Sequence, residues 1–149
     1  TLQDLLFEIS KSFEEITEKK LNLDFTNAKE RIPLKRSPEL TYGIRNFVGN
    51  AVKFSKKNVN INLVGNGQTT TLQISDDGPG FPDDIYKIIG EPYISTKSKK
   101  LKSKAGLGLG TFIGKTLLER KKANIEFLKS NDGGALVEIS WNNKDFIWN

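Results

Sequence analysis

Hydrophobic residues near the start of the chain recur at the three- and four-residue spacing of an amphipathic helix. Thr1 is followed three residues later by Asp4, which is the spacing of a capping box at a helix N-terminus. We therefore expect a helix that runs to about Lys20. The apolar positions that predict it are Leu2, Leu5, Leu6, Ile9, Phe13 and Ile16.

The pattern then changes to an alternation of apolar and polar residues, which is typical of a half-buried strand. This alternation runs from Leu21 to Phe25. Further along, Ser37 followed by Pro38 has the pattern of an N-cap with proline at the first helical position. The apolar stripe behind Pro38 predicts a second helix that ends near Phe54.

Two pairs of short apolar runs, each separated by glycine-containing turn residues, predict β-hairpins over 59–74 and 125–141. Between them we expect a short helix over 82–90 and a longer helix that follows residue 110. Helices and hairpins therefore come in alternating blocks. This order favours an α+β two-layer sandwich over a doubly wound parallel sheet, and 149 residues is the length of one domain.

The composition excludes several kinds of chemistry, because the chain has neither histidine nor cysteine. Disulfides, zinc sites, Ser/His or Cys/His catalysis and a phosphohistidine within this chain are all ruled out. Any metal must therefore be a hard cation held by oxygen atoms. No run approaches the roughly 20 apolar residues that cross a bilayer, and the first 20 residues are too charged for a signal peptide.

Two glycine clusters, 76–80 and 106–110, lie on either side of a lysine-rich stretch over 95–104. The second cluster opens a predicted helix, and this is how backbone N–H groups approach a phosphate chain. A phosphate-loop motif is excluded, because Leu109 stands where a glycine is required five residues before Gly114. The sequence also contains no dinucleotide-binding fingerprint and no His-Arg-Asp catalytic loop, so a different nucleotide-binding fold is indicated.

Four segments together resemble the Bergerat ATP-binding fold that histidine kinases share with gyrase, MutL and the Hsp90 chaperones. Residues 46–54 resemble its N box, 76–80 the first glycine box and 106–110 the second. Glu91, Pro92 and Tyr93 stand at the F box, with Tyr93 in place of the usual phenylalanine. The resemblance covers nearly the whole chain and implies a mixed sheet covered on one face by helices, with a flexible ATP lid over about 91–105.

The resemblance also implies a role for individual residues. Asn46 and Asn50 would be the catalytic positions, and the amide oxygen of Asn50 would bind Mg²⁺, which suits a hard cation. Lys53 would meet a phosphate as a point charge, and Phe54 would pack against the adenine, with plain core packing as the alternative. Asp76 would accept a hydrogen bond from the adenine amino group. Further ATP contacts would come from Asn46, Gly78, Gly80, Tyr93, Lys97, Gly106, Leu107, Gly108, Leu109, Gly110 and Thr111.

Three further expectations concern the first glycine box, the lid and the last turn. We expect Asp77 and Pro79 to be turn residues only. The lid should be mobile until nucleotide or a partner orders it, and its lysines either contact phosphate or form a solvated charge run. Ala135 differs from the threonine that many histidine kinases carry after the two glycines of the last turn.

The branch of the family is indicated by Asn46. The family's ATPases carry a glutamate at this position to activate water, and a carboxamide cannot accept that proton. Residues 90–97 and 107–120 look like the RegB type of redox-responsive sensor kinase. The resemblance therefore favours a sensor histidine kinase over an ATPase or an ATP-driven conformational module of this superfamily.

As a whole, the resemblance implies that residues 1–149 are the catalytic and ATP-binding domain of a two-component sensor. It would use Mg·ATP and pass the γ-phosphoryl group to a histidine on a separate dimerisation domain, for relay to an aspartate on a response regulator receiver domain. The parent would be a homodimeric inner-membrane sensor with this domain in the cytoplasm, and no nucleic-acid partner is expected. The remaining alternatives are a nucleic-acid-binding module that uses the lysine run and a degenerate kinase domain without ATP.

Overall fold

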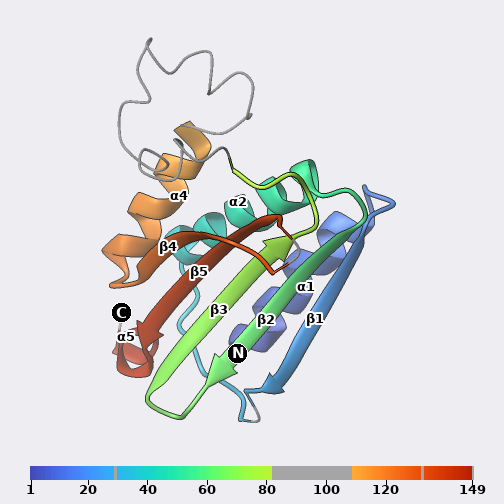
Figure 1. The fold of residues 1–149 in the computed structure, drawn as a ribbon. Helices are drawn as coiled ribbons and strands as arrows, with labels where there is room; N and C mark the ends of the chain where they lie inside the picture. The colour runs from blue at the N-terminus through green and yellow to red at the C-terminus, as the bar shows by residue number, and fades with distance from the viewer. Residues whose placement is uncertain (29, 82–108, 132, 149) are drawn as a thin grey trace.

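The computed structural model describes the whole chain except residues 29, 82–108, 132 and 149. Nine elements follow one another along the described residues (Figure 1). They are α1 (Leu2–Glu14), β1 (Lys20–Asn27), α2 (Pro38–Phe54), β2 (Asn58–Gly65), β3 (Thr69–Asp76), α4 (Leu109–Arg120), β4 (Asn124–Lys129), β5 (Ala135–Asn142) and α5 (Asn143–Trp148). No helix within these described residues is long and apolar enough to cross a membrane.

The strands form one five-stranded mixed sheet in the order β1-β2-β3-β5-β4. β1 pairs with β2 in parallel, and the other neighbours are antiparallel. Helices α1, α2 and α4 lie behind the sheet in the view of Figure 1, while its opposite face is open. The predicted α+β two-layer sandwich, with helices on one face of a mixed sheet, is confirmed.

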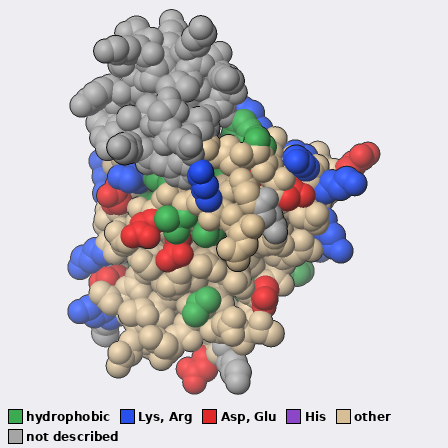
Figure 2. Space-filling view, viewed as in Figure 1, with side chains coloured by type: hydrophobic (Ala, Val, Ile, Leu, Met, Phe, Trp, Pro, Cys, Tyr) green, Lys and Arg blue, Asp and Glu red, His purple; other side chains and the backbone are tan. Residues whose placement is uncertain are grey.

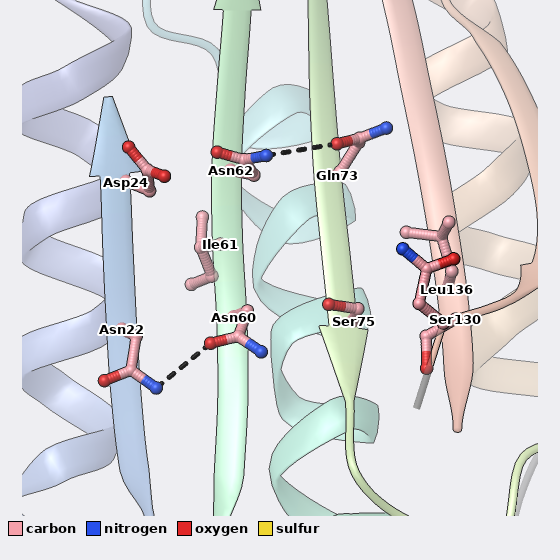
Figure 3. Close-up of a pocket in the computed structure, with 10 residues that line it drawn as sticks. Asn22, Asp24, Asn60, Ile61, Asn62, Gln73, Ser75, Ser130 and Leu136 are labelled. Carbon is pink, nitrogen blue, oxygen red and sulfur yellow. Dashed lines mark hydrogen bonds between the residues drawn. The ribbon is translucent and has the colours of Figure 1, made fainter. Parts of the chain in front are cut away.

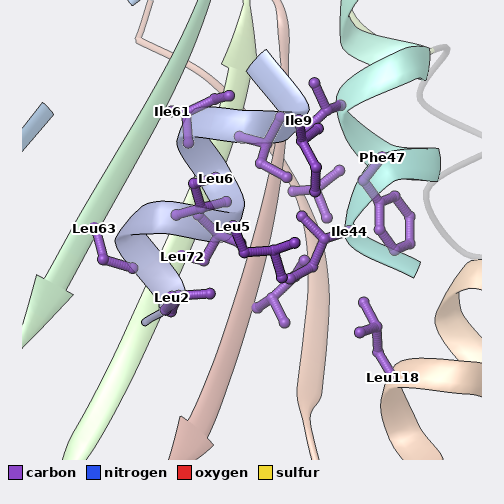
Figure 4. Close-up of a cluster of buried hydrophobic side chains, with 14 of the residues drawn as sticks. Leu2, Leu5, Leu6, Ile9, Ile44, Phe47, Ile61, Leu63, Leu72 and Leu118 are labelled. Atoms are coloured by element: carbon purple, nitrogen blue, oxygen red, sulfur yellow. The ribbon is translucent and has the colours of Figure 1, made fainter. Parts of the chain in front are cut away.

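The core lies between the helices and the covered face of the sheet, because each strand directs alternate side chains toward that face. Val59, Ile61 and Leu63 of β2 are fully buried there, and Leu2, Leu5 and Leu6 of α1 pack into the same cluster (Figure 4). The outward positions carry mostly polar side chains, so the open face remains hydrophilic (Figure 2). Burial therefore follows the sequence alternation closely.

Helices α2 and α4 approach each other closely at glycines. A Cβ atom at Gly43 would lie 2.6 Å from Cγ of Leu118, and one at Gly114 would lie 3.4 Å from Cβ of Asn46. Leu118 is fully buried against this notch in α2. The contact fixes α4 against the helix that carries the N box.

The predicted element boundaries are mostly confirmed, with one error and one omission. α2 begins and ends where Pro38 and Phe54 predicted, but α1 ends at Glu14 and not near Lys20. Ile16 continues the spacing of the apolar stripe of that helix, yet its side chain is 76% exposed. Helix α5 was not predicted from the sequence, and the helix expected over 82–90 lies outside the described residues.

Candidate functional site

Strand β3 ends, helix α2 ends and helix α4 begins at the same end of the molecule (Figure 1). Asp76 is the last residue of β3 and is only 5% exposed. Its Oδ1 atom accepts a hydrogen bond of 2.8 Å from the backbone N–H of Gly78. Burial raises the pKa of Asp76 above its ordinary value, although hydrogen bonds from the N–H groups of Gly78 and Ala135 act in the opposite direction. A buried acceptor therefore forms the floor of this region.

The glycines around Asp76 are required by close backbone contacts. A Cβ atom at Gly78 would overlap the carbonyl oxygen of Phe54, and one at Gly134 would overlap the carbonyl oxygen of Asp76. Gly80 has a φ of +77°, and a Cβ atom at this position would lie 2.7 Å from the carbonyl oxygen of Gly133. The first glycine box is therefore packed directly against the ends of α2 and of the last hairpin.

Asn50 and Thr111 join helix α2 to the start of α4. Nδ2 of Asn50 donates a hydrogen bond of 3.1 Å to Oγ1 of Thr111, which is 2% exposed. Asn46 lies one turn earlier on α2, and a Cβ atom at Gly110 would be 3.2 Å from its Nδ2. Oδ1 of Asn46 is buried and has no hydrogen-bond partner among the described residues. The structure thus brings Asn46, Asn50, Gly110 and Thr111 together.

Lys53 and Phe54 lie at the C-terminal end of α2. Lys53 is exposed, and its Nζ atom is 5.4 Å from the centroid of the Phe54 ring, which is a cation–π distance. Phe54 is half-buried and is not part of the buried core cluster. The alternative that Phe54 is only a core residue therefore receives no support.

Two residues near the site were missed by the sequence analysis. Nζ of Lys19 donates to the carbonyl oxygens of Val52 at 2.6 Å and Lys53 at 3.3 Å, so it caps the C-terminus of α2. Ser130 accepts a hydrogen bond of 3.0 Å from the N–H of Gly134 and closes the last turn. The sequence gives no signal for the role of Lys19, since its contacts join residues far apart in the chain.

The expectation that Asp77 is a turn residue only was incomplete. Its carboxylate accepts hydrogen bonds from the backbone N–H groups of Lys56, Lys57 and Asn58, at 2.7–3.1 Å. Slight burial would raise the pKa of Asp77, but these hydrogen bonds hold that pKa below its ordinary value. Asp77 therefore anchors the loop between α2 and β2.

The remaining predicted site residues lie in or next to the stretch that the structure leaves undescribed. Tyr93, Lys97, Gly106, Leu107 and Gly108 lie outside the described residues, together with the expected lid over 91–105. Leu109 is the first residue of α4. Further along α4, the half-buried Lys115 pairs with Glu119 at 3.1 Å, one helical turn away.

A family model described as "Histidine kinase-, DNA gyrase B-, and HSP90-like ATPase" matches residues 35–144, well over half of the chain. The chain belongs to this family. The matched range contains every predicted site residue that the structure describes. The predicted relationship to the superfamily of histidine kinases, gyrase and Hsp90 is thereby confirmed.

Individual relatives are sensor kinases. The chain is 36% identical over 129 residues to the sensor histidine kinase RegB of Cereibacter sphaeroides, an alignment that covers 75% of this chain and 28% of RegB. It is 34% identical over 70 residues to the sensor protein kinase PilS of Pseudomonas aeruginosa, covering 47% of this chain and 12% of PilS. The chain therefore spans less than a third of the length of these relatives.

Solved structures share the fold. The catalytic domain of histidine kinase ThkA superposes with a TM-score of 0.77 at 19% identity, covering 95% of this chain and 93% of that domain. Full-length ShkA in complex with AMPPNP has a TM-score of 0.73 at 20% identity, covering 94% of this chain and 29% of ShkA. The two-layer fold is thus that of histidine kinase catalytic domains.

Proposed function

We propose that this chain is the ATP-binding catalytic domain of a two-component sensor histidine kinase. It binds Mg·ATP and delivers the γ-phosphoryl group to a histidine on a separate dimerisation domain. The observation that carries the proposal is a buried Asp76 carboxylate enclosed by glycines, in a fold whose helix α2 directs two carboxamides at the start of α4. Because the chain has no histidine, the acceptor belongs to another segment or polypeptide.

Asp76 is suited to reading the adenine base. Its carboxylate is held by the backbone N–H groups of Gly78 and Ala135, so its orientation does not depend on a mobile side chain. An ionised carboxylate only accepts hydrogen bonds, and the exocyclic amino group of adenine donates them. Phe54 and its neighbour Lys53 then offer a ring for the base and a cation for a phosphate.

The polar residues at the start of α4 fit a magnesium-bound triphosphate. Nδ2 of Asn50 is used by Thr111, which leaves the amide oxygen of Asn50 for a hard cation. The buried Oδ1 of Asn46 is a second acceptor without a partner among the described residues. The first N–H groups of α4, which include Leu109, Gly110 and Thr111, have no intrahelical partner and suit phosphate oxygens. When bound, Mg²⁺ would neutralise phosphate charge.

The remaining site residues and partners belong to the same proposal. Gly78 and Gly80 line the base pocket, and Tyr93, Lys97, Gly106, Leu107 and Gly108 complete the ATP contacts. Positioning and charge neutralisation drive the transfer, and no strong base is needed in this domain because the nucleophile is a histidine side chain. The parent is a homodimeric inner-membrane sensor with this domain in the cytoplasm, and a response regulator receives the phosphoryl group.

An ATPase or an ATP-driven conformational module is the rival within the family. Its water-activating step needs a carboxylate where this chain has Asn46, whose amide cannot accept a proton. We therefore expect the isolated chain to bind ATP without sustained hydrolysis. Steady release of phosphate by the purified chain would favour the rival.

The first test is calorimetric titration of Mg·ATP into the wild type and into Asp76→Asn. The substituted asparagine keeps an oxygen that can accept from Gly78, so the fold should persist, but the charge-assisted bond to adenine is lost. We expect affinity to fall by about 10- to 100-fold, which corresponds to about 1.4–2.8 kcal/mol. The matched control is Glu14→Gln, which removes an exposed carboxylate from α1 and should bind normally.

A phosphotransfer assay with a separately produced histidine-bearing helical domain completes the test. Radiolabelled phosphate should reach that domain only when both polypeptides and Mg·ATP are present. If the folded wild type binds no nucleotide, the proposal fails. If it binds nucleotide but never labels the histidine domain, a nucleotide-binding module remains and the kinase assignment is lost.

A further inference from the structure

A row of polar side chains crosses the open face of the sheet, away from the helices. The strand register aligns Asp24 with Asn62, Asn62 with Gln73, Gln73 with Glu138, and Glu138 with Glu126. Each of these residues alternates with neighbours that pack into the core, so all five project from the uncovered side. The row therefore joins all five strands on one surface.

The amide groups in this row have a fixed direction. Ionised Glu138 only accepts hydrogen bonds, so Gln73 presents Nε2 to it at 3.2 Å. Oε1 of Gln73 then faces Asn62 and accepts from its Nδ2 at 3.3 Å (Figure 3). Oδ1 of Asn62 is left buried and without a partner among the described residues. One N–H of each amide is therefore used along the row, and each hydrogen bond runs toward Glu138.

The carboxylate end of the row is electrostatically unfavourable by itself. Glu126 and Glu138 are direct cross-strand partners, so their Cβ atoms are about 5 Å apart, and like charges in this arrangement destabilise a sheet. Neither forms an ion pair with any residue that the structure describes. Figure 2 shows acidic side chains over β4 and β5 beside hydrophobic ones. Within the described part of the chain, this pair therefore lacks a cation.

An apolar step and a groove adjoin the two glutamates. Leu128 and Leu136 are the next cross-strand pair on the same face, and Leu128 is 37% exposed. Leu136 also lines a groove of about 580 Å³ whose other walls include Asn60, Gln73 and Ser75 (Figure 3). The surface thus combines two carboxylates with an apolar strip that lies beside a groove.

We propose that this open face docks an extended, arginine-bearing segment of a partner protein. A guanidinium group carries five N–H donors and no acceptor, and its planar shape matches carboxylates. It would bridge Glu126 and Glu138, while its methylene stem packs on Leu128 and Leu136. Charge complementarity therefore selects a basic occupant. A metal ion fits less well, since no group of three or more His, Cys, Asp or Glu in the described residues could hold one.

The proposal is independent of the proposed function. Asp76 points to the covered side of the sheet and is buried, whereas Gln73, three residues earlier on β3, faces the open side. Occupation of the row therefore does not require nucleotide. Loss of ATP binding and loss of docking can be measured separately on the same chain.

The test uses the full 149-residue chain and a fluorescein-labelled peptide of four Arg-Ser repeats, followed by fluorescence anisotropy. A second peptide replaces each arginine by citrulline, which has the same shape without the charge. We expect at least tenfold tighter binding of the arginine peptide. The double variant Glu126→Gln/Glu138→Gln should bind the arginine peptide at least tenfold more weakly than the wild type.

The matched control is Glu14→Gln/Glu15→Gln, which changes net charge equally but alters exposed residues of the helical layer. It should bind the arginine peptide like the wild type. Equal loss in both double variants would mean binding by total charge and would overturn the proposal. Equal affinity for the arginine and citrulline peptides would also overturn it.

Amide chemical shifts of ¹⁵N-labelled wild type locate the contact without any substitution. Shifts caused by the arginine peptide should concentrate on β3, β4 and β5, with Gln73 and Glu138 among them. Shifts elsewhere would contradict the proposal. Displacement of the peptide by millimolar Mg²⁺ at constant ionic strength would indicate a cation site, and peptide-independent dimerisation through these strands would indicate a second copy; either result overturns the proposed occupant.

Discussion

The two sides of the C-terminal end of β3 carry consecutive aspartates in opposite environments. Asp76 faces the helical layer, where burial raises its pKa. Asp77 faces the loop between α2 and β2, where three backbone N–H groups hold its pKa below the ordinary value despite slight burial. Identical side chains thus have different roles: Asp76 lies in the site that we propose binds a ligand, whereas the carboxylate of Asp77 holds the loop between α2 and β2.

The largest effect on the surroundings of Asp76 should come from adding a side chain at Gly134. A Cβ atom at Gly134 would overlap the carbonyl oxygen of Asp76, so Gly134→Ala should lower the free energy of unfolding by about 3 kcal/mol. Gly133→Ala is the control: nothing lies within 4 Å of its would-be Cβ, and only its φ of +85° opposes alanine, at a cost of about 1 kcal/mol. Urea unfolding measures both. Equal losses would show that Gly134 does not enclose Asp76.

On the other side, Asp77→Ala should destabilise the fold without changing nucleotide affinity. The substitution leaves the N–H groups of Lys56, Lys57 and Asn58 without their acceptor, and by analogy with helix caps the loss should be about 2 kcal/mol. Asp77→Asn retains one acceptor oxygen and should lose less. A variant that unfolds normally but binds Mg·ATP tenfold more weakly would place Asp77 in the ligand site instead.

A smaller effect should separate the two aspartates by pH. Because the pKa of folded Asp76 is raised, it takes up a proton earlier as pH falls from 7, and the adenine contact weakens. The stability that Asp77 contributes is present above its unfolded pKa of about 4 and is lost only as pH falls through its lower folded pKa. The ratio of ATP affinity between wild type and Asp76→Asn should therefore fall before the wild type loses stability. Calorimetry and urea unfolding at matched pH values would check this order.

Local signals made α2 predictable from the sequence. Ser37 accepts a hydrogen bond of 3.2 Å from the N–H of Leu40, and Pro38 begins the helix, as the spacing indicated. The end of α1 was not predictable in this way. Lys20 donates its backbone N–H to the carbonyl oxygen of Lys57 at 2.8 Å and joins the sheet, so a contact distant in sequence overrides the helical pattern of Ile16.

The candidate site likewise contains some residues that local sequence patterns predict and others that they do not. Asp76, Asn50 and Thr111 could be named because their boxes have a recognisable order, and the described structure brings them to one end of the sheet. Lys19 and Ser130 could not, since their partners Val52 and Asp76 lie 33 and 54 residues away. Contacts of this kind depend on how strands and helices meet, which residue spacing does not record.

The notch at Gly43 has a mechanical consequence. Leu118 packs on α2 at Gly43, where any residue larger than glycine in α2 would collide with it. Helix α4 therefore cannot slide along α2 by a fraction of a turn without moving Leu118 out of the core. The residues at the start of α4 therefore belong to a helix whose other end is held by Leu118. A displacement of Gly110 and Thr111 would have to move α4 as a whole, within the limits that the packing of Leu118 permits.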